Sequence, residues 1–237
     1  MRIPVGLELR ALDSIDAERV RAWRNDHRVW RWCRQLDLIS DVAQRGWFER
    51  QAQDPSIRMY SVWLKIGDGG DLVGVCGLTS LDFVNRRAEF SLYVAPEKHR
   101  QGLGRAALTL LLDHAFANLG LDQVFGEVFD GNPALALFAE LGFQLDGKRR
   151  AWYYKESRAW DAHLISITRS EWNGRHARSA PLPNASHAGG DALPAETEGG
   201  AAVRKIGGKA AKRRATGDRV AGGASADAEE SAANLSD

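Results

Sequence analysis

The residues best suited to chemistry lie between Phe90 and Leu112, in the stretch FSLYVAPEKHRQGLGRAALTLLL. An apolar run typical of a strand ends at Val94, a short basic loop follows, and Gly102 and Gly104 precede a helical pattern. The first N–H groups of a helix have no partner within the helix, and the helix dipole places positive charge beside them. This glycine-rich turn is therefore a predicted phosphate-binding site.

Three kinds of phosphate loop have to be distinguished at this turn. The Walker spacing GxxxxGK[ST] does not occur in the sequence. The dinucleotide fingerprint GxGxxG/A fits Gly102, Gly104 and Ala107, with Glu127 at a spacing suited to a ribose contact. In dinucleotide-binding proteins, that fingerprint directly follows a strand and lies within repeated βαβ units. Here a PEKHR loop separates the strand from the glycines, and the preceding strands are predicted to form hairpins. A nucleotide-binding oxidoreductase therefore stays an alternative that the context disfavours.

The aromatic residues divide the chain into two parts. All Trp, Tyr and Phe residues lie at or before Trp172, and residues 1–173 are enough to bury one domain core. Residues 174–237 are mainly Ala, Gly, Ser, Pro and charged residues, with too few large apolar side chains to offset the entropy of ordering. We therefore predict a single domain over 1–173 and a disordered tail over 174–237.

Charge and cysteine content narrow the class of protein. Lys and Arg number 32 and Asp and Glu 31, so the overall charge does not point to nucleic acid. The basic run from Arg204 to Arg219 suits either a solvated linker or an arm that touches nucleic acid or an acidic surface. Cys33 and Cys76 lack metal-ligand spacing and fit a reducing compartment. No signal peptide and no bilayer-spanning apolar run is evident. The sequence predicts a cytoplasmic protein with no metal and no membrane partner; it leaves the oligomeric state open.

The glycine turn needs a sheet and helices to position it, and the hydrophobic pattern predicts both. Strands are expected at Val5–Arg10, Arg58–Ile66, Leu72–Leu81, Ala88–Val94, Gln123–Phe129 and Ala159–Thr168, and a further strand is expected to begin at Phe143 to Leu145. A first helix is expected after Asp13 or Ser14, with an apolar face of Ile15, Val20 and Trp23, and a short helix or turn is expected at HRVWRWCRQ. Further helices are expected from Ser40 to before Pro55, from the glycines to near Gly120, and from Asn132 and Pro133 to Gly142. This order predicts an α+β domain with one parallel step in its sheet.

Two blocks at matched spacing identify a family. AEFSLYVAPEKHRQGLGRAAL followed by NPALALFAELGF resembles the GNAT superfamily of N-acetyltransferases. The pieces WRND and WFERQ, with DAHLISITRSEW near the end, look like the branch that acetylates ribosomal-protein N-termini and certain amino sugars. The resemblance covers nearly all of residues 5–173. It implies a mostly antiparallel sheet with one parallel step flanked by helices, acetyl-CoA as cosubstrate, and direct attack by a primary amine in a ternary complex.

The resemblance also implies roles for individual residues around the turn. The backbone amides expected to hold the CoA pyrophosphate are those of Gln101, Gly102, Gly104 and Arg105. Val94 would face the pantetheine arm or the thioester carbonyl. Asn132 would either steady the cofactor arm or cap the helix that follows it, and both roles stay open.

Two positions depart from the family pattern. His99 stands where Arg or Gln is usual, three residues before the first glycine. Phe138 stands where the family has the tyrosine that protonates the departing thiolate, and a phenylalanine cannot donate a proton. No residue is therefore assigned as general acid, and a catalytically weak acyl-CoA-binding module is a further alternative.

The predicted base is a carboxylate near the turn. An α-amino group has a reference pKa of roughly 7.7–8.0, against about 10.4 for lysine, so an N-terminal or sugar amine needs only a modest base. Glu89 is the first candidate, because such family members often carry an acid on this strand; its other reading is a surface carboxylate paired with Arg86 or Arg87. Glu127 on the adjoining strand is the second candidate.

Acceptor contacts are expected from the helices before the sheet and from the last hairpin. Arg24 and Asn25 of WRND are predicted to bind the acceptor, while Trp23 beside them is predicted to be core. Tyr153 or Tyr154 would either supply the missing proton or line the acceptor pocket. A peptide N-terminus, an amino sugar and a free amino acid all stay open as the acceptor.

Overall fold

The computed structural model describes residues 6–67 and 69–177. Residues 1–5, 68 and 178–237 lie outside the described residues, so nearly all of the predicted tail does too, and the division of the chain at residue 173 stays a prediction. The last described helix, Arg169–Ala177, runs past that division. Its Trp172 is buried and donates through Nε1 to Asp113.

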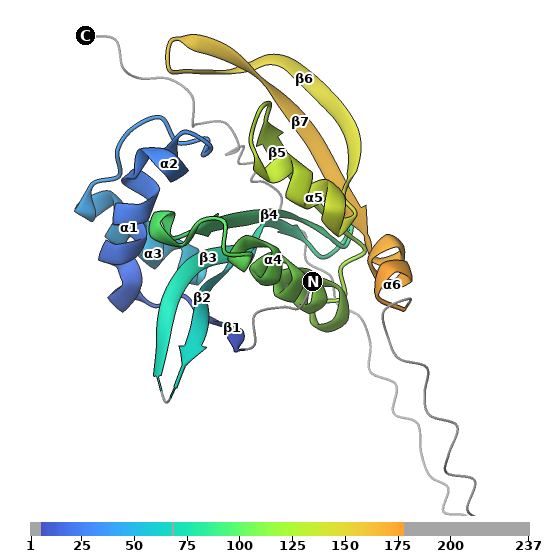
Figure 1. The fold of residues 1–237 in the computed structure, drawn as a ribbon, viewed down its shortest axis with the longest axis horizontal. Coiled ribbons are helices and arrows are strands. Elements are labelled where there is room, and N and C mark those ends of the chain that lie inside the picture. Colours follow the sequence, from blue (N-terminus) through green and yellow to red (C-terminus); the bar gives the residue numbers. More distant parts are fainter. Residues whose placement is uncertain (1–5, 68, 178–237) are drawn as a thin grey trace, which may run out of the picture. The chain divides into compact units, whose positions relative to one another are not determined.

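A seven-stranded sheet forms the centre of the fold, in the order β1-β2-β3-β4-β5-β7-β6 (Figure 1). The strands are β1 (Leu7–Ala11), β2 (Arg58–Ile66), β3 (Gly69–Asp82), β4 (Arg87–Val94), β5 (Gln123–Phe129), β6 (Gln144–Lys155) and β7 (Arg158–Thr168). Neighbouring strands pair antiparallel except β4 and β5, which are parallel. The predicted α+β class with one parallel step is confirmed.

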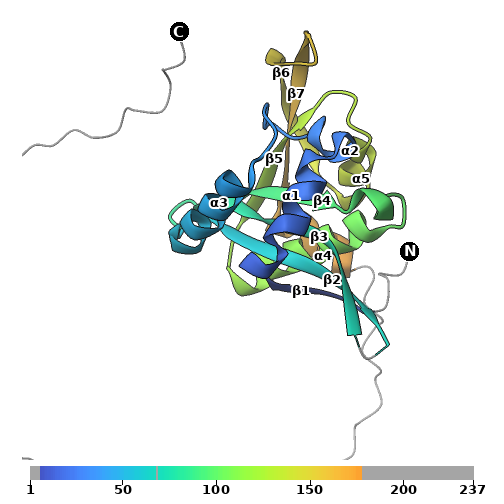
Figure 2. The same cartoon turned by 90° about the vertical axis from the view of Figure 1, so that its left-hand side faces the viewer.

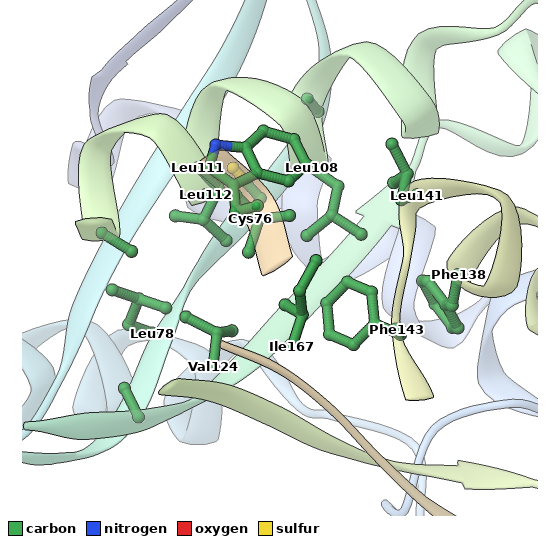
Figure 3. Packing of buried hydrophobic residues seen from close by; sticks show 14 of the residues in the cluster. Cys76, Leu78, Leu108, Leu111, Leu112, Val124, Phe138, Leu141, Phe143 and Ile167 are labelled. Atoms are coloured by element: carbon green, nitrogen blue, oxygen red, sulfur yellow. The ribbon is translucent and has the colours of Figure 1, made fainter. Parts of the chain in front are cut away.

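Helices cover both faces of this sheet. They are α1 (Ala17–Asn25), α2 (His27–Trp30), α3 (Asp41–Gln53), α4 (Leu103–Asp113), α5 (Ala134–Leu141) and α6 (Arg169–Ala177), with 3-10 turns at Ser14–Asp16 and Pro96–Lys98 and a π-helical turn at His114–Asn118. Figure 2 shows α1 and α3 across one face. The helix α4 lies on the other, where Leu108, Leu111 and Leu112 pack against β3, β5 and β7 (Figure 3). None of the helices in the described ranges is long and apolar enough to cross a membrane.

One predicted element was wrong in detail, and one strand extends well beyond its predicted start. Ile15 is 87% exposed instead of buried, because Ser14–Asp16 forms a separate 3-10 turn and α1 begins only at Ala17; Val20 and Trp23 are buried as predicted. The strand predicted to begin at Phe143 to Leu145 starts at Gln144 and runs to Lys155, an end that the sequence did not indicate. It is an edge strand, exposed along most of its length and interrupted by two register shifts, so it shows no apolar alternation.

The parallel strands β4 and β5 separate soon after they meet. They pair only between Arg87–Glu89 and Gln123–Phe125, although β4 continues to Val94 and β5 to Phe129. Just beyond the last pair, the Phe90 ring fills the space where a side chain at position 126 would lie. A Cβ on Gly126 would be only 2.3 Å from Phe90 Cε1. We call this point of separation the fork. Beyond it, β4 has backbone groups that β5 does not bind, which is where an extended ligand can add hydrogen bonds.

Candidate active site

The glycine turn has the backbone conformation of an anion-binding loop. Gly102 is the N-cap of α4 with a φ of 77°, and Arg100 two residues earlier has a φ of 64°. Left-handed residues next to a helix start turn successive N–H groups toward one point. A left-handed non-glycine residue is costly, and such strain is concentrated at functional sites. This backbone conformation is therefore suited to binding a negatively charged group.

A pocket of about 470 Å³ opens in front of this turn. Its walls come from α2, the end of β4, the loop after β4, the first turn of α4 and the start of α5. Four cationic side chains line it: Arg28, Lys98, Arg100 and Arg105. A cation-rich pocket at a helix N-terminus is suited to phosphate groups.

Most of these cations are held in place by carboxylates. Arg28 donates to both oxygens of Asp26, at 2.9 and 2.6 Å, and this hydrogen bonding lowers the pKa of Asp26 to about 2. Lys98 lies 3.3 Å from Asp71, and Arg105 pairs with Glu140 of α5. Arg28, Lys98 and Arg105 are therefore each oriented by a carboxylate.

The structure brings most of the predicted ligand-binding residues to this one pocket. Val94, Gly102, Gly104, Arg105 and Asn132 all line it. Gln101 is exposed, and its neighbours on both sides line the pocket.

His99, which differs from the family pattern, and Asn132, for which two roles were predicted, each make a hydrogen bond that supports the local structure. His99 donates from Nε2 to the Val94 carbonyl at 3.1 Å, which fastens the loop to the end of β4. Asn132 accepts the Ala134 N–H on Oδ1 at 2.9 Å, so it caps α5 while also lining the pocket. Both readings of Asn132 are compatible with this position.

Phe138 lines the same pocket and is only 6% exposed. Its ring packs against Phe90 and Phe143, with centroid distances of 5.1 and 5.9 Å. The position therefore contributes apolar surface to the pocket and no proton donor.

Glu89 lies at the fork, and its partner was not predicted. Arg34, from the loop between α2 and α3, places Nη2 at 2.9 Å from Glu89 Oε1, and the Glu89 side chain is 12% exposed. The predicted pairing with Arg86 or Arg87 is wrong, since these residues pair with Asp122 and Asp82. The loop between α2 and α3 is far from β4 in the sequence, so no local sequence pattern indicates that Arg34 contacts Glu89.

Glu127 lies on the same face of the sheet as Glu89, because it is two residues beyond Phe125, which pairs with Glu89. Arg149 of β6 places Nη1 at 2.8 Å from Glu127 Oε2. The other oxygen, Oε1, is buried and has no hydrogen-bond partner among the described residues. A buried acceptor without a partner is costly, so this atom is suited to an N–H donor from a ligand.

Tyr153 lies beside both the Glu127 carboxylate and the Arg34 guanidinium. Its pKa is raised to about 12, by burial first and then by Glu127, so the hydroxyl keeps its proton at neutral pH. We call the five residues at this place the fork cluster: Arg34, Glu89, Glu127, Arg149 and Tyr153. Leu92, the first β4 residue along the pocket, is roughly 10 Å along the strand from Glu89.

The two predicted acceptor residues of α1 differ in what they contact. Asn25 donates from Nδ2 to the Ile39 carbonyl at 2.9 Å and accepts the Ile39 N–H on Oδ1 at 2.8 Å, so its amide ties α1 to the loop before α3. The Arg24 guanidinium lies 5.9 Å from the Tyr93 ring, and its Nε is buried with no partner among the described residues. Acceptor binding by either residue stays a prediction.

Lys155, which no sequence pattern marks, holds the loop that carries Arg34. It is 4% exposed, and Nζ donates to the carbonyls of Trp30, Cys33 and Gln35 at 2.7, 2.8 and 2.8 Å. The ammonium also lies 3.7 Å from the Trp30 ring centroid. Since Lys155 ends β6, this contact joins the last hairpin to the helices that precede the sheet (Figure 1).

No group of three or more His, Cys, Asp and Glu side chains in the described part of the chain is arranged to hold a metal ion.

Comparison with known proteins gives a consistent result. The family model described as acetyltransferase (GNAT) domain matches residues 6–144. The N-alpha-acetyltransferase RimI of Mycobacterium tuberculosis is 34% identical over 143 residues, which cover 56% of this chain and 82% of that protein. The spermidine N(1)-acetyltransferase of Vibrio cholerae is 29% identical over 170 residues, covering 71% of this chain and 96% of that protein.

The fold has a solved counterpart. The crystal structure of spermidine N-acetyltransferase from Vibrio cholerae in complex with CoA and spermine has a TM-score of 0.67 and 24% sequence identity, covering 70% of this chain and 98% of that one. The matched family region contains the glycine turn, the fork and the start of α5. The chain therefore belongs to the GNAT acetyltransferase family and is an N-acetyltransferase.

Proposed function

We propose that the enzyme binds acetyl-CoA in the pocket at the glycine turn and transfers its acetyl group directly to a primary amine at the fork. One observation carries this proposal: Val94, Gly102, Gly104, Arg105 and Asn132 surround a single cation-rich pocket. The unpaired part of β4 leads from that pocket to the fork. A long cosubstrate and an amine can therefore meet along one strand edge.

The residues around the pocket fit a CoA molecule. The amides at the start of α4 would hold the pyrophosphate, with Arg100 and Arg105 nearby. The free backbone groups between Phe90 and Val94 would bind the pantetheine arm and orient the thioester carbonyl. CoA supplies the activated acetyl group, and the protein supplies position and a route for the proton.

At the fork, a carboxylate would accept the proton as the amine nitrogen bonds to the acetyl carbon and the bond from that carbon to sulfur breaks. Glu89 is our first candidate for this base and Glu127 the second. Tyr153, which keeps its proton at neutral pH, is a candidate donor to the thiolate in place of the tyrosine absent at position 138. Water is the alternative donor, because a thiolate leaves readily.

A protein N-terminus or an amino sugar is the proposed acceptor. The name of the mycobacterial relative supports an N-terminal amine, and a Bacillus subtilis relative, 28% identical, is named a putative ribosomal N-acetyltransferase. The names of other relatives make spermidine the competing acceptor. We place the reaction in the cytoplasm, in keeping with the two free cysteines, Cys33 and Cys76.

Thermal unfolding with and without CoA tests the cosubstrate. A ligand present at 100 times its Kd stabilises the folded state by about 2.7 kcal/mol, so CoA should raise the Tm while NAD and NADP leave it unchanged. Acetyl-CoA turnover on a panel of amines, followed by mass spectrometry of the products, tests the transfer. Stabilisation by NADP but not by CoA would overturn the proposal, and CoA binding without transfer to any amine would favour a binding module.

Substitutions of the two glycines are expected to separate stability from CoA binding. A Cβ on Gly104 would lie 3.7 Å from Val94 Cγ2 and 3.8 Å from Leu137 Cδ2, which is ordinary contact between pocket residues. Gly104→Ala should therefore keep or raise stability, by up to about 1 kcal/mol, and weaken CoA binding by narrowing the pocket. Gly102→Ala should cost roughly 1–2 kcal/mol, because alanine is strained at a φ of 77°.

Urea unfolding and calorimetric titration with CoA measure the two effects. Gly174→Ala is the matched control, at a glycine inside α6 whose Cβ direction meets no atom of the described residues. It should raise stability by a similar amount through helix propensity and leave CoA affinity unchanged. Unchanged CoA affinity in Gly104→Ala would contradict the position we assign to the cosubstrate.

A further inference from the structure

A continuous aromatic wall joins the pocket to the fork cluster. Trp32 lines the pocket and meets Trp160 edge to face at 5.9 Å. Trp160 meets Phe129 at 5.9 Å, and Phe129 stacks on Tyr153 at 4.7 Å. The Trp160 indole donates to the Lys155 carbonyl at 2.9 Å, which fixes the wall on the last hairpin. Trp160 and Phe129 are buried and support the wall from behind, whereas Trp32 and Tyr153 are only half-buried. A ligand that extends away from the thioester would therefore contact Trp32 and Tyr153.

Arginines surround this wall. The Arg31 guanidinium lies 4.9 Å from the Trp32 ring and that of Arg158 lies 3.4 Å from the Trp160 ring, while Arg34 and Arg149 belong to the fork cluster. The carboxylates at the same place are Glu89, Glu127 and Glu156. The arginines outnumber these carboxylates, and Lys155 adds a further positive charge. The local field therefore favours an anion over a second cation.

The arginines at the fork still have donors to offer. A guanidinium carries five N–H groups. Arg34 contacts Glu89 and Tyr153, and Arg149 contacts Glu127 through Nη1, so neither residue uses all of its donors. Their side chains are 51% and 43% exposed, so solvent or a ligand reaches them. A carboxylate or phosphate group can be bound without breaking the pairs to Glu89 and Glu127.

Two of the buried atoms that lack a partner among the described residues belong to Glu127 and Arg31, and they need opposite kinds of partner. Glu127 Oε1 is an acceptor without a donor, and Arg31 Nε is a donor without an acceptor, among the described residues. An amine satisfies the first and an anionic oxygen satisfies the second. A polyamine would satisfy only the first and would place its other ammonium groups among the arginines.

We propose that the acceptor is a primary amine that also carries an anionic group, a carboxylate or a phosphate, with the amine at Glu127 and the anion at the arginines around the wall. This inference rests on the proposed function, because it assumes that the amine acceptor binds at the fork. It separates the enzyme from relatives whose names specify spermidine.

Matched acceptors test the proposal. One pair is glucosamine and glucosamine 6-phosphate, and the other is a dipeptide amide that begins with Gln and its counterpart that begins with Glu; spermidine is the cationic comparison. Binding to the CoA-saturated enzyme is measured by calorimetry, and kcat/KM by acetyl transfer. We expect at least tenfold tighter binding of the anionic member of one pair, and the pair that responds identifies the source of the anion.

The two readouts distinguish the two ideas. Equal binding within both pairs, no binding of any of these acceptors, or tighter binding of spermidine than of either anionic compound would overturn the inference even if transfer occurs. Anion preference in binding without any acetyl transfer would keep the inference and overturn the proposed function.

Charge-removing variants locate the anion. Arg31→Gln and Arg158→Gln should each reduce the preference for the anionic member at least threefold, and kcat/KM should change mainly through KM. Arg45→Gln on α3, which removes an exposed arginine paired with Asp41, is the matched control and should leave the preference unchanged. A preference that survives in both Arg31→Gln and Arg158→Gln would contradict the assigned position.

Discussion

Replacement of Lys155 by Met is expected to lower the free energy of unfolding by about 3 kcal/mol. Hydrogen bonds to a charged group each contribute roughly 1.5–3 kcal/mol, and Nζ makes three of them, to Trp30, Cys33 and Gln35. The cost of burying the ammonium, which also lowers the Lys155 pKa, offsets part of that sum. Methionine keeps the length of the side chain and its packing on Trp30, so the variant removes mainly the donor.

The same substitution should affect the acceptor more than the cosubstrate. The three carbonyls belong to the end of α2 and the loop that carries Arg31, Trp32 and Arg34, whereas the glycine turn belongs to α4. We therefore expect KM for the acceptor to rise several-fold, with a smaller change in CoA affinity.

Urea unfolding and steady-state kinetics measure these changes. Lys65→Met is the matched control, because Lys65 is exposed and makes an ion pair with Glu8, which contributes at most about 1 kcal/mol. Equal effects of the two substitutions on stability would show that the buried lysine has no anchoring role.

The sequence predicted those elements whose signals are local. The strands Arg58–Ile66 and Gln123–Phe129 have the predicted bounds. The helix between Asn132 and Gly142 was found from its capping residues: the Asn132 side chain binds the Ala134 N–H, and Gly142 has a φ of 106°. The glycine turn was likewise visible, because conformation and chemistry are encoded within a few residues.

The edge strand β6 and its turn into β7 could not be predicted from local sequence signals. β6 is open to solvent, so no apolar alternation marks Gly147 to Lys155. Its turn into β7 uses Glu156 and Ser157, both at positive φ, instead of the Asn and Gly typical of two-residue hairpins. The contact of Glu156 with His27, at 2.7 Å, holds this turn against α2. Tertiary contacts therefore override the local preference at this end of the hairpin.

The fork cluster shows the same limit for the candidate site. Glu89 and Glu127 were identified from their strands, but Arg34 and Arg149 come from a loop and an edge strand far away in the sequence. Only the fold brings these arginines to the two glutamates. No local sequence pattern identifies an exposed arginine in a loop as part of a site. The abundance of arginine between residues 19 and 34 is the one signal that was available.

Replacement of Glu89 by Gln is expected to lower kcat about 100-fold or more while leaving CoA affinity unchanged. A positioned general base contributes typically 10²–10⁴-fold, and glutamine has the shape of glutamate without its basicity. The amide oxygen can still accept from Arg34, whose side chain is half exposed, so the loss of stability should be within about 1 kcal/mol. The measurements are single-turnover acetyl transfer, CoA titration and urea unfolding.

Glu127→Gln is the comparison that assigns the base, because the two carboxylates share one face of the sheet and each is paired with an arginine. Glu127 has an oxygen with no partner among the described residues, which suits binding of the amine, whereas Glu89 lies on the strand that leads to the pocket. We therefore expect Glu127→Gln to raise the acceptor KM and Glu89→Gln to lower kcat. The reverse outcome would move the base to Glu127, and small equal effects would remove Glu89 from the chemistry and leave the amine to react by position alone.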